Sequence, residues 1–356
     1  MRLCALGDIM LGDHPIKIGH GVGTKISQFG SKYIFEDVKS LLKNSDIVFG
    51  NLETVISKKK SKNNDIFSNS LRGTPESVEG LLYSGFNFLN LANNHTMGHG
   101  EEAFNETVQI LQSNGINCLG LSKDSNNPLF FEKDGLKIGF LAYSLRPEES
   151  SSEPLYSSGN KRKIIDEISA LRPNVDYIII SLHWGDEFVN KPSKEQIHLS
   201  HELIDSGADV LLGHHSHVLQ GVEEYNNGII AYSLGNFVFD MWQFRCRTTA
   251  ILSIELTRDN IAFKLLPVFI DSNYRPRLVR GNRRKRFEEY FKKLNNKARF
   301  SLKRIDSNNY ESQVEEQRTK YRWSLKSYFL TNFFNYNIYY IFDFAKKFLN
   351  DKNPIK

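Results

Sequence analysis

Short apolar runs alternate with segments of helical spacing along most of the chain. Five short apolar runs predict buried strands, at residues 2–7, 46–49, 86–92, 176–182 and 210–213. Five intervening segments repeat apolar residues every three or four positions and predict helices, at residues 33–43, 74–83, 101–113, 161–171 and 193–206. A short strand is also expected at 116–119. The alternation indicates parallel strands joined by helices.

Turn residues between further apolar runs predict antiparallel strands. Asp134-Gly135 separates residues 130–132 from 136–143 and is a strong hairpin signal. Beyond residue 217, strands are expected at 218–225, 228–233, 249–256 and 261–269. The predicted fold class is therefore α/β, with sheet packed on sheet. Exposed loops are expected at 58–69 and 146–160, and the second is long enough to lie over a site.

The pattern changes near residue 276, where a C-terminal extension is expected to follow a body formed by residues 1–275. Arg283-Arg284-Lys285-Arg286 precedes apolar residues at helical spacing, which predicts a basic amphipathic helix. Residues 328–349 are rich in Phe and Tyr but broken by Asn, Asp and Lys. A spanning helix needs about 20 mainly apolar residues, so an interfacial segment fits better. The alternatives are packing against the body or a dimer contact.

Charge divides the chain in the same place. Residues 280–356 hold 19 Lys and Arg against 8 Asp and Glu, a net charge of +11, whereas residues 1–279 hold 27 against 33, a net charge of −6. A basic extension suits an anionic membrane surface or an anionic polymer. No recognition motif accompanies it, so no specific nucleic acid is expected.

The start of the chain and its cysteines indicate where the protein works. Residues 2–8 run directly into a strand, without a charged leader and apolar core. We therefore expect a cytoplasmic protein, with peripheral contact to the inner face of the membrane as a further expectation. Cys4, Cys118 and Cys246 are scattered, which excludes a disulfide framework and a thiolate metal site. Any metal must be bound by nitrogen and oxygen.

Three histidines directly follow a short apolar run that predicts a buried strand. The run 208–212 ends in Gly213-His214-His215-Ser216-His217. If the segment stays extended, His215 and His217 project to the same side and can bind one ion or a pair. Taken alone, the cluster could equally hydrogen-bond its own loop, so partners from other strands decide between the two interpretations.

Four other strand ends carry polar residues that can bind a cation. Asp8 follows the first strand, Asn51 and Glu53 follow the second, and an amide-rich turn with one imidazole follows the third. His183, Asp186 and Glu187 follow the most apolar strand, at 176–182. Burying an imidazole and two carboxylates there is costly unless they are paired or bound to metal. The complete ligand set is Asp8, Asn51, Glu53, Asn94, His95, His183, His215 and His217. Oxygen and imidazole ligands together suit a two-metal hydrolytic site with Mn, Fe or Zn.

These motifs resemble a known family. GDIML, GNLET, LANNHTMGHG, HWGDE, GADVLLGHHSHVLQGVE and YSLGNFVFD occur in the order and approximate spacing of the CapA, or poly-gamma-glutamate capsule synthesis, proteins over residues 1 to about 270. The family is similar in fold to calcineurin-like metallophosphoesterases. The resemblance implies a four-layer α/β/β/α sandwich, to which the basic helical extension 276–356 is added.

The resemblance also implies roles for single residues. The divalent metals, one or two in number, would be held by Asp8, Glu53, Asn94, His183, His215 and His217. His95 would act as general acid on the leaving group. Residues expected to contact substrate or support the ligands are Asn51, Asn93, Trp184, Glu187, His214 and Asn236.

The implied function is metal-dependent hydrolysis of a phosphoester or an amide in capsule or other surface-polymer biosynthesis. The expected partners are an anionic polymer or its lipid-linked precursor, and a polymer synthase. The alternative is a non-catalytic subunit that binds the polymer or the synthase through the same cleft.

Two positions depart from the pattern that the resemblance predicts. The phosphoesterase pattern Asp-x-His would place histidine where Met10 stands, so at least one metal position is altered. An aspartate common after the Asn-Asn-His motif is absent, and His99 occupies that region. Met10 is the feature that favours the non-catalytic alternative.

Overall fold

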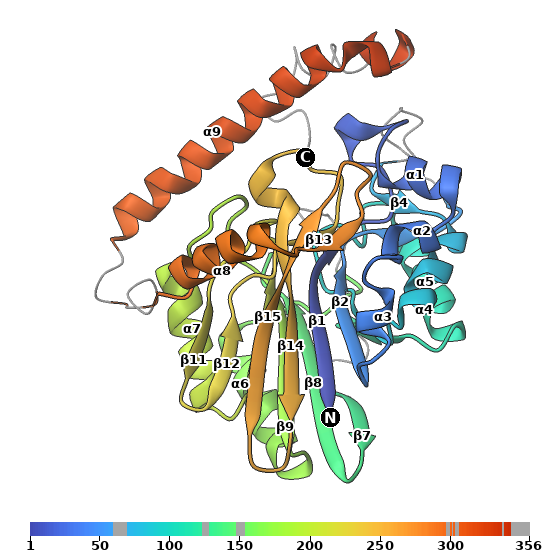
Figure 1. Ribbon diagram of the computed structural model, residues 1–356. Helices are drawn as coiled ribbons and strands as arrows, with labels where there is room; N and C mark the ends of the chain where they lie inside the picture. Colours follow the sequence, from blue (N-terminus) through green and yellow to red (C-terminus); the bar gives the residue numbers. More distant parts are fainter. Residues whose placement is uncertain are drawn as a thin grey trace.

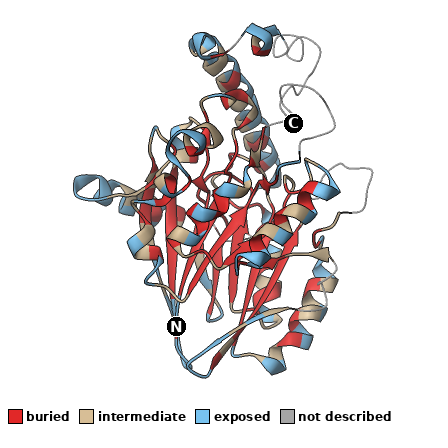
Figure 2. Cartoon of the chain, turned by 90° about the vertical axis from the view of Figure 1, so that its right-hand side faces the viewer, coloured by how far each residue is buried: buried red, intermediate tan, exposed pale blue. Residues whose placement is uncertain are grey.

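Two large β-sheets form the centre of the protein in the computed structural model (Figure 1). The structure describes residues 1–59, 70–122, 128–146, 154–296, 300, 302, 306–336 and 338–342. Residues 60–69 and 147–153 of the two expected loops therefore lie outside the described residues. Buried residues concentrate in the strands, whereas the surrounding helices have a buried and an exposed side (Figure 2).

The larger sheet contains the N-terminal strand at its centre. Its order is β16 (Pro276–Leu278), β15 (Ile261–Ile270), β14 (Thr248–Leu256), β1 (Arg2–Ile9), β2 (Ile47–Leu52), β5 (Phe88–Asn90) and β6 (Asn117–Leu119), with β13 (Asn236–Val238) also pairing with β1. β1, β2, β5, β6 and β13 run parallel, and β14 is antiparallel to β1. The carboxyl ends of β1, β2 and β5 therefore meet at one edge.

The smaller sheet brings the remaining strands together. Its order is β11 (Val222–Tyr225), β12 (Gly228–Ala231), β10 (Val210–His214), β9 (Tyr177–His183), β8 (Leu136–Ser144) and β7 (Leu129–Lys133). β8, β9, β10 and β12 are parallel. The predicted hairpin between β7 and β8 is confirmed, with Asp134 and Gly135 both at positive φ, as its tight turn requires. A separate pair joins β3 (Val55–Ile56) to β4 (Arg72–Gly73).

The side-chain alternation of the strands sets which layer each residue faces. Along β1, Leu3 and Ala5 pack against Ile138 and Phe140 of the smaller sheet, so the two sheets share an apolar core. Cys4 and Leu6 point the other way and pack with helices. The predicted α/β class with sheet packed on sheet is thus confirmed.

Helices cover the outer face of each sheet. Those that pack with the larger sheet are α1 (Val22–Phe29), α2 (Lys32–Phe35), α3 (Lys39–Leu42), α4 (Val78–Ser84) and α5 (Glu101–Ser113). Those that pack with the smaller sheet are α6 (Lys161–Leu171) and α7 (Lys194–Asp205). Short 3-10 turns complete the body: η1 (Pro15–Lys17), η3 (Pro75–Ser77), η5 (Arg172–Asn174) and η6 (Phe244–Arg247).

Two predicted elements differ in the structure. The single helix expected at 33–43 is wrong, because the chain turns between α2 and α3, where the Asp37 carboxylate pairs with Arg275 and Arg277. The strand expected at 218–225 begins only at Val222, because the chain preceding it continues the turn that starts after β10.

The C-terminal segment adds two longer helices. The predicted basic helix is confirmed as α8 (Asn282–Leu294), which buries Phe291 and Leu294 against the body. α9 (Ser307–Thr331) crosses the end of the molecule where β1 and β2 finish, and a 3-10 turn, η9 (Phe333–Asn335), follows it (Figure 1). Among the described residues, no helix is long and apolar enough to span a bilayer.

Candidate metal centre

Asp8 anchors the site at the carboxyl end of β1. Its side chain is fully buried, and its Oδ1 atom accepts a hydrogen bond of 2.8 Å from the Asn51 Nδ2 atom. The preceding Gly7 allows this approach, because a Cβ atom there would lie 1.9 Å from the carbonyl oxygen of Gly235. The close contact also brings the next residue, Asn236, to the same edge, in register with Asp8.

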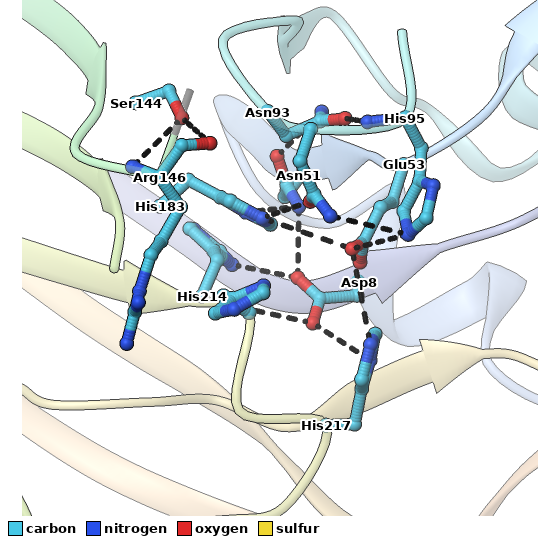
Figure 3. Close-up of polar contacts among 12 residues, drawn as sticks. Asp8, Asn51, Glu53, Asn93, His95, Ser144, Arg146, His183, His214 and His217 are labelled. Carbon is cyan, nitrogen blue, oxygen red and sulfur yellow. Dashed lines mark hydrogen bonds and ion pairs between the residues drawn. The ribbon is translucent and has the colours of Figure 1, made fainter. Parts of the chain in front are cut away.

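Glu53 lies directly beyond β2 and faces the histidines. Its Oε1 atom is 3.7 Å from the Nε2 atom of His183, 3.8 Å from that of His95 and 3.9 Å from that of His217 (Figure 3). The side chain is fully buried, and neither carboxylate oxygen has a hydrogen-bond partner among the described residues. A buried carboxylate without donors is costly, so this one requires a cation or a proton.

The amide-rich turn after β5 supports the ligands. The Asn93 side chain donates to the Asn51 Oδ1 atom at 3.2 Å, and its own Oδ1 atom accepts from the His95 backbone N–H at 3.1 Å. The Asn94 Oδ1 atom lies 2.7 Å from the His183 Nε2 atom. The turn thus places one amide oxygen beside His183 and holds the His95 ring over Glu53 (Figure 3).

Two neighbouring residues at the end of β9 face opposite sides of the smaller sheet. His183 points into the cluster, and its Nδ1 atom lies 3.4 Å from the Asn51 Nδ2 atom. Trp184 points the opposite way, packs in the core outside the smaller sheet and donates to the Tyr232 carbonyl oxygen. Glu187 is half-buried, and its negative charge helps to raise the pKa of Glu53 and of His217.

The turn after β10 supplies the last three imidazoles. His214 ends the strand, and its Nδ1 atom is 3.3 Å from the Asp8 Oδ1 atom. The expectation that the next residues stay extended is wrong, because His215 and His217 both have positive φ, at 89° and 57°. Both rings nevertheless reach the cluster from a tight turn, where non-glycine residues rarely adopt such backbone angles.

Hydrogen bonds fix the orientation of this turn. The His215 backbone N–H donates to the Asp8 Oδ2 atom at 3.3 Å. The His217 Nδ1 atom lies 2.9 Å from the Asn236 Oδ1 atom, which leaves its Nε2 atom directed at Glu53. Asn236 is therefore placed as a supporting residue that orients a ligand.

Two groups of three side chains are close enough to hold a metal ion. Glu53, His183 and His215 form one group, and Asp8, Glu53 and His217 form the other, with ligand atoms within 4.8 Å of one another in each. All five side chains are buried, and Glu53 belongs to both groups. Carboxylate oxygen and imidazole nitrogen suit Mn, Fe or Zn, so the donor set fits one or two divalent ions.

Burial and mutual charge shift the pKa values in the cluster. Burial, aided by the Asp8 carboxylate, raises the pKa of Glu53 well above its usual range. Burial alone would lower the pKa of His217, but the carboxylates of Glu53 and Asp8 together raise it to about 10. Burial and the neighbouring His215 ring hold the pKa of His183 well below its usual range, so that ring is neutral, as a metal ligand must be.

His95 differs from the other histidines in its exposure. Its side chain is 28% exposed, whereas those of His183 and His217 are 0% and 2% exposed. Burial lowers the pKa of His95 to about 4 in the metal-free protein. A neutral ring at the open side of the cluster can exchange a proton with a bound molecule, and a bound anion would raise its pKa.

The two positions that depart from the expected pattern lie outside the ligand groups. Met10 is fully buried in the apolar core, and its sulfur accepts a hydrogen bond from the Gly12 N–H. The His99 Nε2 atom lies 2.8 Å from the Ser70 carbonyl oxygen, and neither ligand group among the described residues includes it. The group that contains Asp8 therefore has one candidate ligand fewer than the resemblance predicts.

Two residues near the cluster were not among the predicted site residues. His14 is buried beyond β1, and its Nε2 atom lies 3.3 Å from the hydroxyl of Tyr321 on α9. The Tyr321 ring stacks on Phe188 at 4.3 Å between centroids, and Phe188 in turn faces His217. His14 lies six residues beyond Asp8, and this closeness was the only sequence signal; nothing in the pattern linked Tyr321 to the body.

Comparison with known proteins places this site in a family. The family model of the bacterial capsule synthesis protein PGA_cap matches residues 2–241. The capsule biosynthesis protein CapA of Bacillus anthracis is 33% identical over 273 residues, which cover 73% of this chain and 64% of that protein. The PGA biosynthesis protein CapA of Bacillus subtilis is 30% identical over 274 residues, covering 74% of this chain and 70% of that protein.

Among solved structures, the chain is similar to the NAD nucleotidase of Haemophilus influenzae, with 14% identity and a TM-score of 0.45, covering 92% of this chain and 60% of that one. This chain spans about two thirds of the length of its curated relatives. The CapA resemblance of the sequence motifs is confirmed: the chain belongs to the bacterial capsule synthesis protein PGA_cap family.

Proposed function

We propose that this protein is a metal-dependent hydrolase that acts in the biosynthesis of a capsule, of poly-gamma-glutamate or of a related surface polymer. The reaction is cleavage of a phosphoester or an amide in the anionic polymer or its lipid-linked precursor. The biosynthetic setting follows from the family, because the two Bacillus relatives are named for capsule and PGA biosynthesis. A polymer synthase is the corresponding partner.

One observation carries the hydrolase proposal: Glu53 is shared by two groups of potential metal ligands, and its carboxylate accepts no hydrogen bond from the described residues. Because Glu53 belongs to both groups, it would help to hold an ion at either position. Bound divalent ions would lower the pKa of water and polarise the bond to be cleaved. His183 and His215 would hold one ion, and Asp8 and His217 the other.

The chain's own residues have separable tasks in this reaction. Asn51 and Asn236 orient Asp8 and His217 through hydrogen bonds of 2.8 and 2.9 Å. Asn94, beside His183, is the candidate amide ligand. His95, at the more exposed side of the cluster, is placed to donate a proton to the leaving atom.

A second candidate function is a non-catalytic subunit that binds the polymer or the synthase through the same cleft. Met10 favours it, because a buried thioether stands where the phosphoesterase pattern has histidine. A site with one ion, or with none, would still offer imidazole and amide donors to an anionic chain.

Turnover measurements with the metal-loaded full chain separate the two functions. The protein is loaded with Mn²⁺ or Zn²⁺ and assayed on a generic phosphodiester and on a gamma-glutamyl amide. The hydrolase proposal predicts turnover that a chelator removes and that His217→Ala and His95→Ala abolish while circular dichroism stays unchanged. Binding of poly-gamma-glutamate without any turnover would favour the non-catalytic subunit.

A further inference from the structure

The last described part of the chain presents two opposite faces. One face of α9 packs on the body: Tyr321, Leu325 and Tyr328 follow one another at spacings of four and three residues and contact the apolar cluster around Ile16. The Lys17 Nζ atom donates to the Tyr328 hydroxyl at 2.6 Å, and the Gln243 side chain donates to the Ser324 hydroxyl at 2.8 Å. This inner face holds α9 against the loops that surround the metal centre.

The docking continues beyond the helix. Tyr336 and Tyr340 stack on each other and are buried in the same cluster as Ile16. Their hydroxyl groups donate to the backbone oxygens of Ile16 and Pro15. Part of the aromatic segment therefore packs against the body, one of the alternatives that the sequence left open.

Other large apolar side chains of α9 and of the residues after it are exposed to solvent. Seven large apolar side chains of the described residues are at least 63% exposed, and six of them lie between residues 323 and 342. We define them as the apolar outer face: Trp323, Leu330, Phe334, Ile338, Tyr339 and Phe342. Such a concentration on one short segment exceeds what scattered surface residues explain and marks an interaction surface.

Charge identifies the kind of surface that this face fits. Residues 317–342 contain Arg318, Lys320, Arg322 and Lys326 but no Asp or Glu. Lys320 and Arg322 are exposed and pair with Glu316 and Glu315, in the preceding part of the helix. The Lys326 ammonium lies 5.5 Å from the centre of the Trp323 ring, so a cation sits at the edge of the apolar outer face.

We propose that the apolar outer face binds the surface of a lipid bilayer that contains anionic lipids. Tryptophan and tyrosine favour the headgroup region, leucine and phenylalanine enter the boundary of the acyl chains, and lysine and arginine remain among the anionic headgroups. The segment lies in the plane of the interface and does not span it. A second protein chain is a less suitable occupant, because the cores of protein interfaces are depleted in charge and the lysines here adjoin the aromatic rings.

Bilayer binding has a consequence for the metal centre. The inner face of α9 contacts Phe188 and His14, which adjoin the metal-binding cluster. A bilayer on the outer face would thus lie across one helix from these loops. This proposal rests on α9 and holds whether or not the site hydrolyses its ligand.

Vesicle sedimentation with the full chain tests the proposal. Vesicles of phosphatidylcholine alone are compared with vesicles that also contain phosphatidylglycerol, at low and high salt. The proposal predicts sedimentation with the anionic vesicles that weakens in salt. The triple variant Trp323→Ser/Phe334→Ser/Phe342→Ser should lower the partition coefficient at least about tenfold, because three aromatic side chains no longer enter the interface.

Controls keep this experiment decisive. Phe130→Ser and Phe244→Ser remove exposed phenylalanines elsewhere and should sediment like wild type. Trp323→Phe should retain binding but lose the blue shift of tryptophan emission on vesicles. Equal sedimentation of the triple variant and wild type, or no vesicle binding by wild type, overturns the proposal. If wild type does not bind vesicles but forms concentration-dependent dimers that the triple variant cannot form, the apolar outer face binds a second copy of the chain instead.

Discussion

The Oε1 atom of Glu53 lies 3.9 Å from the Nε2 atom of His217, and both side chains are buried. In the part of the chain that the structure describes, neither Glu53 oxygen has a hydrogen-bond partner, although the His217 ring is oriented by Asn236. A protein does not gain stability from a carboxylate placed in this way, because the cost of desolvation is not offset by donors. The arrangement makes sense as a site that a cation completes.

The two metal positions should differ in affinity. The group with His183 and His215 also has the Asn94 oxygen nearby, whereas near the group with Asp8 and His217 the buried Met10 offers no imidazole. Calorimetric titration with Mn²⁺ should therefore show two unequal steps. His217→Ala should remove the weaker step, and His215→Ala the tighter one. If each variant lost both binding steps equally, the two ions would not occupy separate positions.

His95 should matter most for poor leaving groups. A general acid contributes about 100- to 10,000-fold when the leaving oxygen needs a proton, and far less when the leaving group is already acidic. His95→Gln should therefore slow hydrolysis of a phenyl or alkyl ester much more than that of a p-nitrophenyl ester. His198→Gln, whose side chain is 62% exposed on α7, is the matched control and should change neither rate. An equal loss on all esters would assign His95 a binding role.

His14 should make the metal-free protein less stable in acid. Burial lowers the pKa of His14 from 6.5 to about 3, so below pH 6.5 the unfolded chain binds a proton that the folded protein excludes. The buried neutral ring therefore leaves the free energy of unfolding unchanged above pH 6.5. Below pH 6.5 that free energy decreases as the pH falls, by up to about 1.4 kcal/mol per pH unit. Protonation would also break the bond from the Ile16 N–H to the His14 Nδ1 atom.

Urea unfolding at a series of pH values measures this effect. His14→Gln should flatten the decline in the free energy of unfolding between about pH 6.5 and pH 5. His198→Gln, as an exposed counterpart, should follow the wild-type slope. An unchanged slope in His14→Gln would show that the imidazole is charged in the folded protein.

The sequence predicted the site better than it predicted the path of the chain through it. Strand ends of one parallel sheet share an edge, so the order of strands and polar residues along the chain is enough to group Asp8, Glu53 and Asn94. His183 joins them from β9 of the smaller sheet, and this pairing of the two sheets is a tertiary feature. The turn after His214 could not be predicted, because hydrogen bonds to Asp8 and Asn236 hold it at positive φ.

Tertiary packing determines the direction of several aromatic side chains, which the local sequence pattern does not predict. Alternation along β9 turns Trp184 into the outer core, although its neighbour His183 is at the site. The aromatic residues of the C-terminal segment have no distinctive spacing, yet Tyr321 docks near His14 while Trp323 faces solvent. Only the position of α9 against the body separates these two roles.

Metal content, measured together with the free energy of unfolding in wild type and Glu53→Gln, shows whether Glu53 completes a metal site. We expect one or two divalent ions per wild-type chain and nearly none in Glu53→Gln, because both ligand groups share this carboxylate. The metal-free variant should be at least as stable as metal-free wild type near neutral pH, since a carboxyl group buried without hydrogen-bond donors is replaced by a neutral amide, and added Mn²⁺ should stabilise only the wild type. Full metal content in a folded Glu53→Gln protein would contradict the account.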